Sequence, residues 1–174
     1  MKTLILGGIR SGKSRLAEAL AVQCGLEVTY LATALAGDAE MCRRIEQHRA
    51  RRPAEWTVIE APYTLAAALR RYAGPQRCLL VECLTLWLTN LLCYGDKLAR
   101  LSGECEALLN TLPGLPGHII LVANETGMGL VPLGELSRRY SDEAGLLHQR
   151  LAGLCDRVIL TVAGLPWVLK GKAL

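Results

Sequence analysis

The residues best suited to chemistry lie near the start of the chain, in the pattern Gly7-x-x-x-x-Gly12-Lys13-Ser14. This spacing is typical of a phosphate-binding loop, or P-loop. The glycines allow backbone angles that a Cβ atom disfavours, so consecutive N–H groups can surround a phosphate. Lys13 supplies a positive charge for the β- and γ-phosphates, and the Ser14 hydroxyl is a ligand for Mg²⁺. The predicted triphosphate site comprises Gly7, Gly8, Ile9, Arg10, Ser11, Gly12, Lys13 and Ser14.

A glycine-rich turn with an incidental lysine is the competing interpretation of this stretch. The neighbouring residues argue against it, because a short apolar run at 4–6 precedes the loop and a helical segment at 15–23 follows it. A helix in that position presents its N-terminus to a bound anion.

Glu82 is the second candidate group, at the end of the apolar run 78–82. In P-loop proteins a carboxylate at the end of such a strand orients Mg²⁺ or water. Aspartate is the commoner residue there, and an ordinary carboxylate at a strand end remains the alternative. The position predicts a role for Glu82 with the metal or the nucleotide.

His48 is the third candidate, in a predicted helix at 38–51. Met41, Ile45 and His48 share a helix face, and arginines surround the histidine at positions 44, 49, 51 and 52. Periodicity alone allows a core histidine behind a basic helix. The other interpretation is a nucleophilic or acid–base histidine, because neighbouring cations keep imidazole neutral and stabilise charge on an attacked phosphate.

These residues need a scaffold in which strands and helices alternate along the chain. Beyond the first strand, apolar and β-branched runs predict strands at 27–32, 57–60, 78–82, 118–123, 158–163 and 167–170. Helices are predicted at 15–23, 38–51, 63–72, 84–94, 98–112 and 134–153. The alternation predicts an α/β fold of the P-loop type, a mainly parallel sheet with helices on both faces. The short 164–166 linker predicts an antiparallel final pair.

In parallel sheets, ligands collect where the strands end. We therefore expect the loops after Leu6, Ala32, Glu82 and Ala123 to lie on one edge.

Composition narrows the class of protein. The chain has 174 residues, a formal charge of +4, seven scattered cysteines without a C-x-x-C pair, and three histidines that are far apart. This predicts a single domain over 1–174 in a reducing, cytoplasmic compartment, with cysteine as a buried apolar residue and no zinc site. We see no signal peptide or membrane span, and the basic run lacks the interleaved aromatic residues expected of nucleic-acid binding.

Motifs along nearly the whole chain resemble those of the bifunctional adenosylcobinamide kinase/adenosylcobinamide-phosphate guanylyltransferase family. They begin with the P-loop octapeptide, which is narrower than a generic P-loop. The other similar blocks are Tyr30-Leu-Ala-Thr33, Asp38-x-Glu-Met41, Arg44-Ile-x-x-His48, Arg52-Pro-x-x-Trp56, Leu80-Val-Glu-Cys-Leu-Thr85, Thr89-Asn-Leu-Leu92, Asn124-Glu-x-Gly-Met-Gly-x-Val-Pro132, Asp142-x-x-Gly145 and Gln149-Arg-Leu-Ala152. His148 departs from the asparagine usual in the family.

The resemblance implies two reactions. A nucleoside triphosphate, ATP or GTP, phosphorylates the aminopropanol hydroxyl of adenosylcobinamide; GTP then passes GMP through a histidine to adenosylcobinamide phosphate. It implies that His48 carries the GMP, that Lys13 is catalytic, that Thr33, Glu60 and Glu82 join the nucleotide site, and that Ser14 and Glu82 hold Mg²⁺. It also implies a homotrimer. Open alternatives are a plain small-molecule kinase, a nucleotide-dependent binding module, and a member that has lost one activity.

Overall fold

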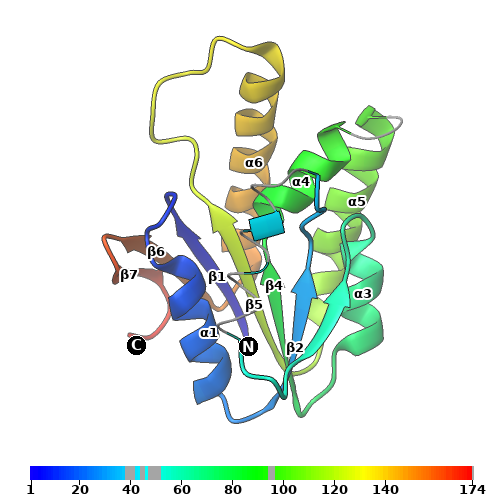
Figure 1. Cartoon of the computed structure of the whole chain (residues 1–174), viewed down its shortest axis with the longest axis vertical. Coiled ribbons are helices and arrows are strands. Elements are labelled where there is room, and N and C mark those ends of the chain that lie inside the picture. Colours follow the sequence, from blue (N-terminus) through cyan, green and yellow to red (C-terminus); the bar gives the residue numbers. More distant parts are fainter. Residues whose placement is uncertain (38–41, 44–45, 47–51, 94–96, 174) are drawn as a thin grey trace.

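A seven-stranded sheet forms the centre of the computed structural model, which describes residues 1–37, 42–43, 46, 52–93 and 97–173 (Figure 1). The strand order is β3-β2-β4-β5-β1-β6-β7. Neighbouring strands are parallel except for the antiparallel β6–β7 pair, as the sequence predicts. The strands are β1 Lys2–Gly7, β2 Glu27–Ala32, β3 Thr57–Glu60, β4 Arg77–Glu82, β5 His118–Asn124, β6 Arg157–Val162 and β7 Leu165–Lys170.

Helices cover both faces of this sheet, which confirms the predicted α/β class. They are α1 Lys13–Gln23, α3 Leu65–Tyr72, α4 Leu84–Cys93, α5 Lys97–Thr111 and α6 Glu135–Leu154, with a 3₁₀ turn η1 at Leu112–Gly114. The smaller apolar core lies between the sheet and α1, where Ala17 and Ala21 let the helix approach closely. The larger core packs α3, α4, α5 and α6 against the other face, with Trp87 fully buried.

The turn between β6 and β7 is shorter than the predicted 164–166 linker. Ala163 and Gly164 form it alone, with φ of 52° and 81°, and β7 already begins at Leu165. Two successive positive φ angles match the two-residue hairpin turn whose twist suits antiparallel strands. Pro166 suggests a break in the strand, but β7 is an edge strand and needs no donor on its outer side.

Helix boundaries differ from the predicted ones by one or two residues. Helix α1 starts two residues early, at Lys13, because the P-loop leads directly into it. The predicted helix 38–51, with Asp38 and His48, lies largely outside the described residues.

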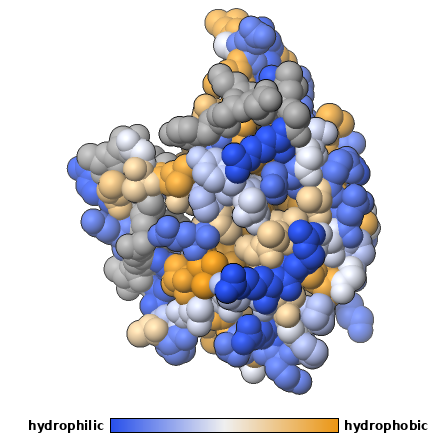
Figure 2. Space-filling view, turned by 90° about the vertical axis from the view of Figure 1, so that its right-hand side faces the viewer, coloured by the Kyte–Doolittle hydropathy of each residue, from blue (hydrophilic) through white to orange (hydrophobic). Residues whose placement is uncertain are grey.

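The described surface is mixed in character. Figure 2 shows one face on which apolar patches alternate with hydrophilic residues. Among the described helices, none is both long and apolar enough to cross a membrane.

Candidate active site

The carboxyl ends of the parallel strands meet at one edge of the sheet. In the register of β1, Gly7 lies between Asn124 of β5 and Thr161 of β6. On the other half of the sheet, Ala32 lies between Glu60 of β3 and Glu82 of β4. The loops after Leu6, Ala32, Glu82 and Ala123 therefore share this edge, as predicted.

The P-loop has the backbone geometry that its glycines predict. Gly12 has φ of 96°, and Arg10, with φ of 57°, also lies in the left-handed region. A Cβ atom on Gly7 would lie 2.7 Å from the carbonyl oxygen of Thr161, so only glycine fits at the first position. The Ser11 amide donates to the Gly8 carbonyl at 3.2 Å and closes the loop as a compact turn. A loop curled in this way is the form in which consecutive backbone N–H groups can surround a phosphate.

The β6–β7 turn supports the P-loop from outside. The Gly164 amide donates to the Ser11 carbonyl at 2.8 Å. A Cβ atom on Gly12 would lie 3.1 Å from the Gly164 Cα, so the two backbones are in close contact. The amide of Glu125, just after β5, donates to the Gly7 carbonyl at 3.0 Å. Segments far apart in sequence thus hold both ends of the loop.

Lys13, Ser14 and Glu82 come together at the mouth of the loop. The Lys13 ammonium donates to the Gly8 carbonyl at 3.2 Å, so this nearly buried side chain lies over the loop. The Ser14 hydroxyl donates to Glu82 Oε1 at 2.7 Å across 68 positions of sequence. Two oxygen atoms at the P-loop suit Mg²⁺, which takes few protein ligands and completes its shell with water and phosphate oxygens. The described residues hold no cluster of three or more His, Cys, Asp or Glu side chains suited to a metal.

Arg52 adds a positive charge near Glu82, because it packs against Tyr30. Its guanidinium stacks over the Tyr30 ring, 4.1 Å from the centroid. Burial raises the pKa of Tyr30, the Glu82 carboxylate raises it further, and Arg52 opposes both. Tyr30 is thus a neutral phenol that lies near both the Glu82 carboxylate and the Arg52 guanidinium. Its ring holds Arg52, the last of the predicted arginine cluster, near the end of β4.

Thr33 and Glu60, the other predicted nucleotide residues, lie at the same edge in different environments. Thr33 is fully buried, and its hydroxyl donates to the Cys83 carbonyl at 2.7 Å and accepts from the Cys83 amide at 2.8 Å. This side chain fixes the backbone next to Glu82. Glu60 is exposed at the end of β3. The structure brings both residues to the edge, and their contact with a nucleotide stays a prediction.

The three histidines of the chain belong to three different regions of the sequence and fold. His48 lies outside the described residues. His118 begins β5 at the opposite edge of the sheet, where it pairs with Cys78. His148 is buried on α6; burial lowers its pKa, and the nearby Glu125 carboxylate opposes that shift.

Several contributors to the site are not evident in the sequence. Asn90 of α4 is buried, and its amide donates to the Thr33 carbonyl at 2.8 Å and the Pro62 carbonyl at 3.0 Å, which ties two edge loops together. An asparagine within an otherwise apolar stretch of helix is a signal that could have found it. Thr161 and Gly164 had no such signal, because β6 and the β6–β7 turn follow the P-loop by some 150 positions and only the strand order places them beside it.

Sequence comparisons give a consistent result. Residues 3–169 match the family model described as cobinamide kinase / cobinamide phosphate guanyltransferase. The chain is 67% identical over 174 residues, all of both chains, to the bifunctional adenosylcobalamin biosynthesis protein CobP of Pseudomonas aeruginosa. It is 38% identical over 177 aligned positions, covering 95% of this chain and 97% of the other, to the bifunctional adenosylcobalamin biosynthesis protein CobU of Escherichia coli.

A structural comparison concerns the fold alone. A solved structure from Pyrococcus horikoshii OT3 superposes with a TM-score of 0.58 and 9% identity, covering 99% of this chain and 87% of that chain.

Proposed function

The chain belongs to the cobinamide kinase / cobinamide phosphate guanyltransferase family, and from that premise we propose how its residues divide the two reactions. It is an enzyme of cobalamin biosynthesis. In the first reaction a nucleoside triphosphate, ATP or GTP, gives its terminal phosphoryl group to the aminopropanol hydroxyl of adenosylcobinamide. In the second, GTP gives GMP to adenosylcobinamide phosphate, yielding adenosylcobinamide-GDP and pyrophosphate.

The contact that carries this proposal is the Ser14–Glu82 hydrogen bond at the mouth of the P-loop. It places a hydroxyl and a carboxylate together beside the loop that cradles the β- and γ-phosphates. Ser14 and Glu82 would hold Mg²⁺, which neutralises phosphate charge when bound.

Phosphoryl transfer depends mainly on positioning and charge stabilisation. The P-loop amides hold the triphosphate, and Lys13 stabilises the negative charge that develops as the terminal phosphoryl group leaves. The acceptor hydroxyl forms the new oxygen–phosphorus bond and loses its proton to solvent or a nearby base. The nucleoside diphosphate is the leaving group.

Guanylyl transfer adds a covalent step for which His48 is the proposed nucleophile. A neutral imidazole nitrogen forms a bond to the α-phosphorus of GTP, and the bond from that phosphorus to the bridging oxygen breaks, releasing pyrophosphate. The phosphate of adenosylcobinamide phosphate then takes the GMP group and frees the histidine. Arg52, held against Tyr30 near Glu82, adds positive charge to this corner.

Labelled GTP tests the covalent step directly. Wild-type protein incubated with Mg²⁺ and GTP labelled on its α-phosphate should acquire label that acid removes and alkali leaves in place, as a phosphorus–nitrogen bond requires. GTP labelled on its γ-phosphate should leave no label. His48→Asn should abolish labelling and guanylyl transfer while keeping the kinase reaction, which does not need this nucleophile.

His118→Asn is the matched control, because His118 lies at the opposite edge of the sheet and should leave labelling intact. Acid-labile label that persists in His48→Asn would instead assign the covalent role to His118 or His148. A wild-type protein that shows no label but has full kinase activity would contradict the covalent mechanism and leave a plain kinase.

The assembly and location belong to the same proposal. We propose that the chain acts as one domain over 1–174, in the cytoplasm, as a homotrimer. Four apolar side chains between β5 and α6 support self-association, since they are 76–97% exposed: Met128, Leu130, Val131 and Leu133. Exposed apolar clusters are typical of interfaces between proteins. Analytical ultracentrifugation of the wild type and of Leu130→Glu tests this, and a monomeric wild type would contradict it.

A further inference from the structure

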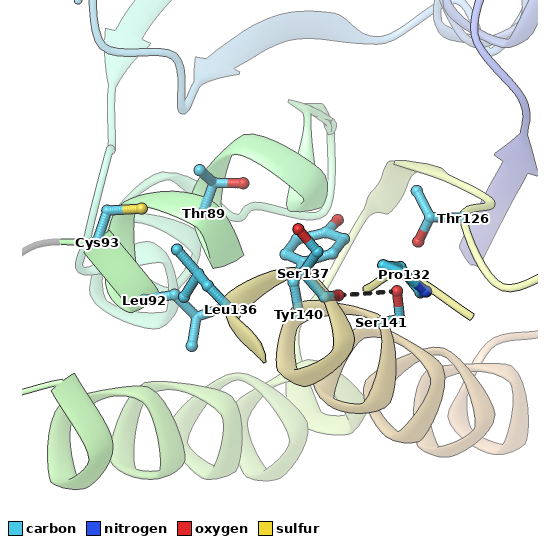
Figure 3. A pocket seen from close by; sticks show the side chains of 9 residues that line it. All are labelled: Thr89, Leu92, Cys93, Thr126, Pro132, Leu136, Ser137, Tyr140 and Ser141. Carbon is cyan, nitrogen blue, oxygen red and sulfur yellow. Dashed lines mark hydrogen bonds between the residues drawn. The ribbon is translucent and has the colours of Figure 1, made fainter. Parts of the chain in front are cut away.

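A second hollow lies beyond the P-loop, on the same edge of the sheet. Its volume is about 340 Å³, and it is lined by residues of α4, of α6 and of the segment between β5 and α6 (Figure 3). Pockets for small molecules span roughly 300–1,000 Å³, so this one fits a small molecule or one arm of a larger one. Its lining is Thr89, Leu92, Cys93, Thr126, Pro132, Leu136, Ser137, Tyr140 and Ser141.

The lining has a distinct chemical character. Of the residues that line it, five carry hydroxyl groups, four are apolar or cysteine, and none of those described carries a charge. Figure 3 shows Thr89 on one wall, and Ser137 and Tyr140 on the other. A pocket of this kind does not suit a triphosphate, which needs cations or a cradle of amides. It suits an uncharged group with amide or hydroxyl functions and short alkyl segments.

Tyr140 is the most informative of these side chains. Its hydroxyl is buried beside the Thr85 hydroxyl at the start of α4. Burial raises the pKa of Tyr140 to about 12, and the neighbouring Thr85 hydroxyl opposes that shift. The phenol therefore keeps its proton near neutral pH. A phenolic hydroxyl both donates and accepts, so beside Thr85 it can still make a further hydrogen bond to a ligand.

Hydrogen bonds connect this hollow to the nucleotide site. The Thr89 hydroxyl donates to the Thr85 carbonyl at 2.9 Å, and the Thr85 hydroxyl accepts from the Asn124 amide at 2.7 Å. The next amide, that of Glu125, donates to the Gly7 carbonyl of the P-loop at 3.0 Å. Thr126 follows directly and lines the hollow. Hydrogen bonds between neighbouring residues thus connect the lining of the hollow to the backbone of the P-loop.

We propose that this hollow is the acceptor pocket, which binds the uncharged amide and alkyl part of the corrinoid's aminopropanol arm and directs its reacting oxygen toward the P-loop. The assignment rests on the proposed function and adds the location of the second substrate. The pocket is far smaller than an adenosylated corrinoid, so the ring system lies outside it. The hydroxyl groups of the lining can donate to an amide carbonyl and accept from an amide N–H, so they match both polar atoms of an amide.

Filling the pocket is the first test. Ser137→Leu adds bulk to the lining at an exposed helical position. It should raise KM for adenosylcobinamide about tenfold or more, since the added volume excludes the arm. KM for GTP and the labelling of the protein by GTP should not change. Ser102→Leu, at an exposed position of α5, is the matched control and should alter neither reaction.

Removing one hydroxyl is the finer test. Tyr140→Phe should weaken equilibrium binding of adenosylcobinamide by roughly three- to tenfold, the usual loss for one neutral hydrogen bond. Tyr72→Phe removes the same group from a tyrosine of α3 that packs against the larger core, away from the pocket. It should leave binding unchanged.

The outcomes separate this proposal from the proposed function. Unchanged adenosylcobinamide binding and KM in Ser137→Leu and Tyr140→Phe, with an active wild type, would overturn the acceptor pocket alone. A larger change in KM for GTP than for adenosylcobinamide would also overturn it and make the hollow a nucleotide subsite. A wild-type protein that neither binds nor phosphorylates adenosylcobinamide would overturn both assignments.

Discussion

The P-loop and the acceptor pocket lie on the same edge of one sheet, yet they are built by different means. The P-loop is made of consecutive residues whose backbone is proposed to bind the phosphates, and its shape depends on Gly7 and Gly12. The acceptor pocket is made of side chains from α4, α6 and the segment between β5 and α6. The first is specified locally, whereas the second depends on how distant elements pack.

This difference predicts how each region responds to change. Both reactions use a triphosphate, so damage to the P-loop should affect both and also the covalent labelling. Damage to the acceptor pocket should affect both reactions only through the corrinoid. The predictions below test that division.

Lys13→Ala should have the largest effect. Loss of the ammonium that stabilises the transferred phosphates should lower both rates by about 10²–10³-fold, the cost of removing one preorganised charge-stabilising donor. Initial rates of the two reactions measure it, with Lys172→Ala, at an exposed position, as control. If either reaction kept a near-normal rate, one cradle could not serve both triphosphates.

Glu82→Gln should have a smaller effect with a specific signature. The amide keeps the shape of the Ser14 contact but removes the charge, so the Mg²⁺ concentration for half-maximal activity should rise about 10–100-fold. The free energy of unfolding should change little. Glu27→Gln, at the opposite edge of the sheet, is the control. A Mg²⁺ dependence identical to the wild type would make Glu82 an ordinary strand-end carboxylate.

Gly12→Ala tests the contact between the P-loop and the β6–β7 turn. A Cβ atom at φ of 96°, pressed against Gly164, should cost about 1–3 kcal/mol in the free energy of unfolding. Gly8→Ala is the comparison, because a Cβ atom there meets no atom within 4 Å. Urea denaturation measures both variants. Equal free energies of unfolding for Gly12→Ala and Gly8→Ala would show that the P-loop can shift without cost and that the β6–β7 turn does not hold it.

His148→Asn should have the smallest effect, and one that depends on pH. Burial lowers the pKa of His148 in the folded state, so below about 6.5, the ordinary histidine value, the unfolded state binds more protons. The contribution of His148 should therefore lower wild-type stability as the pH drops below that value, and it should change little above it. Asparagine removes this contribution, while that of His118, of the same sign, remains in both proteins.

Unfolding in urea at pH 7.5 and at 5.5 would measure this contribution. The loss of stability on acidification should be smaller for the variant than for the wild type. Equal losses would mean that His148 titrates in the fold as it does in the unfolded chain.

Much of the fold was predictable because the signals are local. Strands β2 and β3 lie where their apolar and β-branched runs predict. The alternation of strands and helices predicts the parallel sheet, and that alone brings Gly7, Ala32 and Glu82 to one edge. The β6–β7 turn was predicted one residue too long, because Pro166 suggests a break that an edge strand tolerates.

The sequence by itself determined the P-loop pattern and the edge at which it meets the end of β4, and it indicated Glu82 as a candidate partner, because spacing and periodicity encode backbone geometry over a few residues. Only the tertiary structure decided that Gly164 supports the P-loop, that Asn90 ties the edge loops, and that Tyr140 faces a pocket. These contacts join residues from different elements, and which ones meet depends on strand order and helix packing. Many sequences satisfy the same local pattern, so it leaves those contacts open.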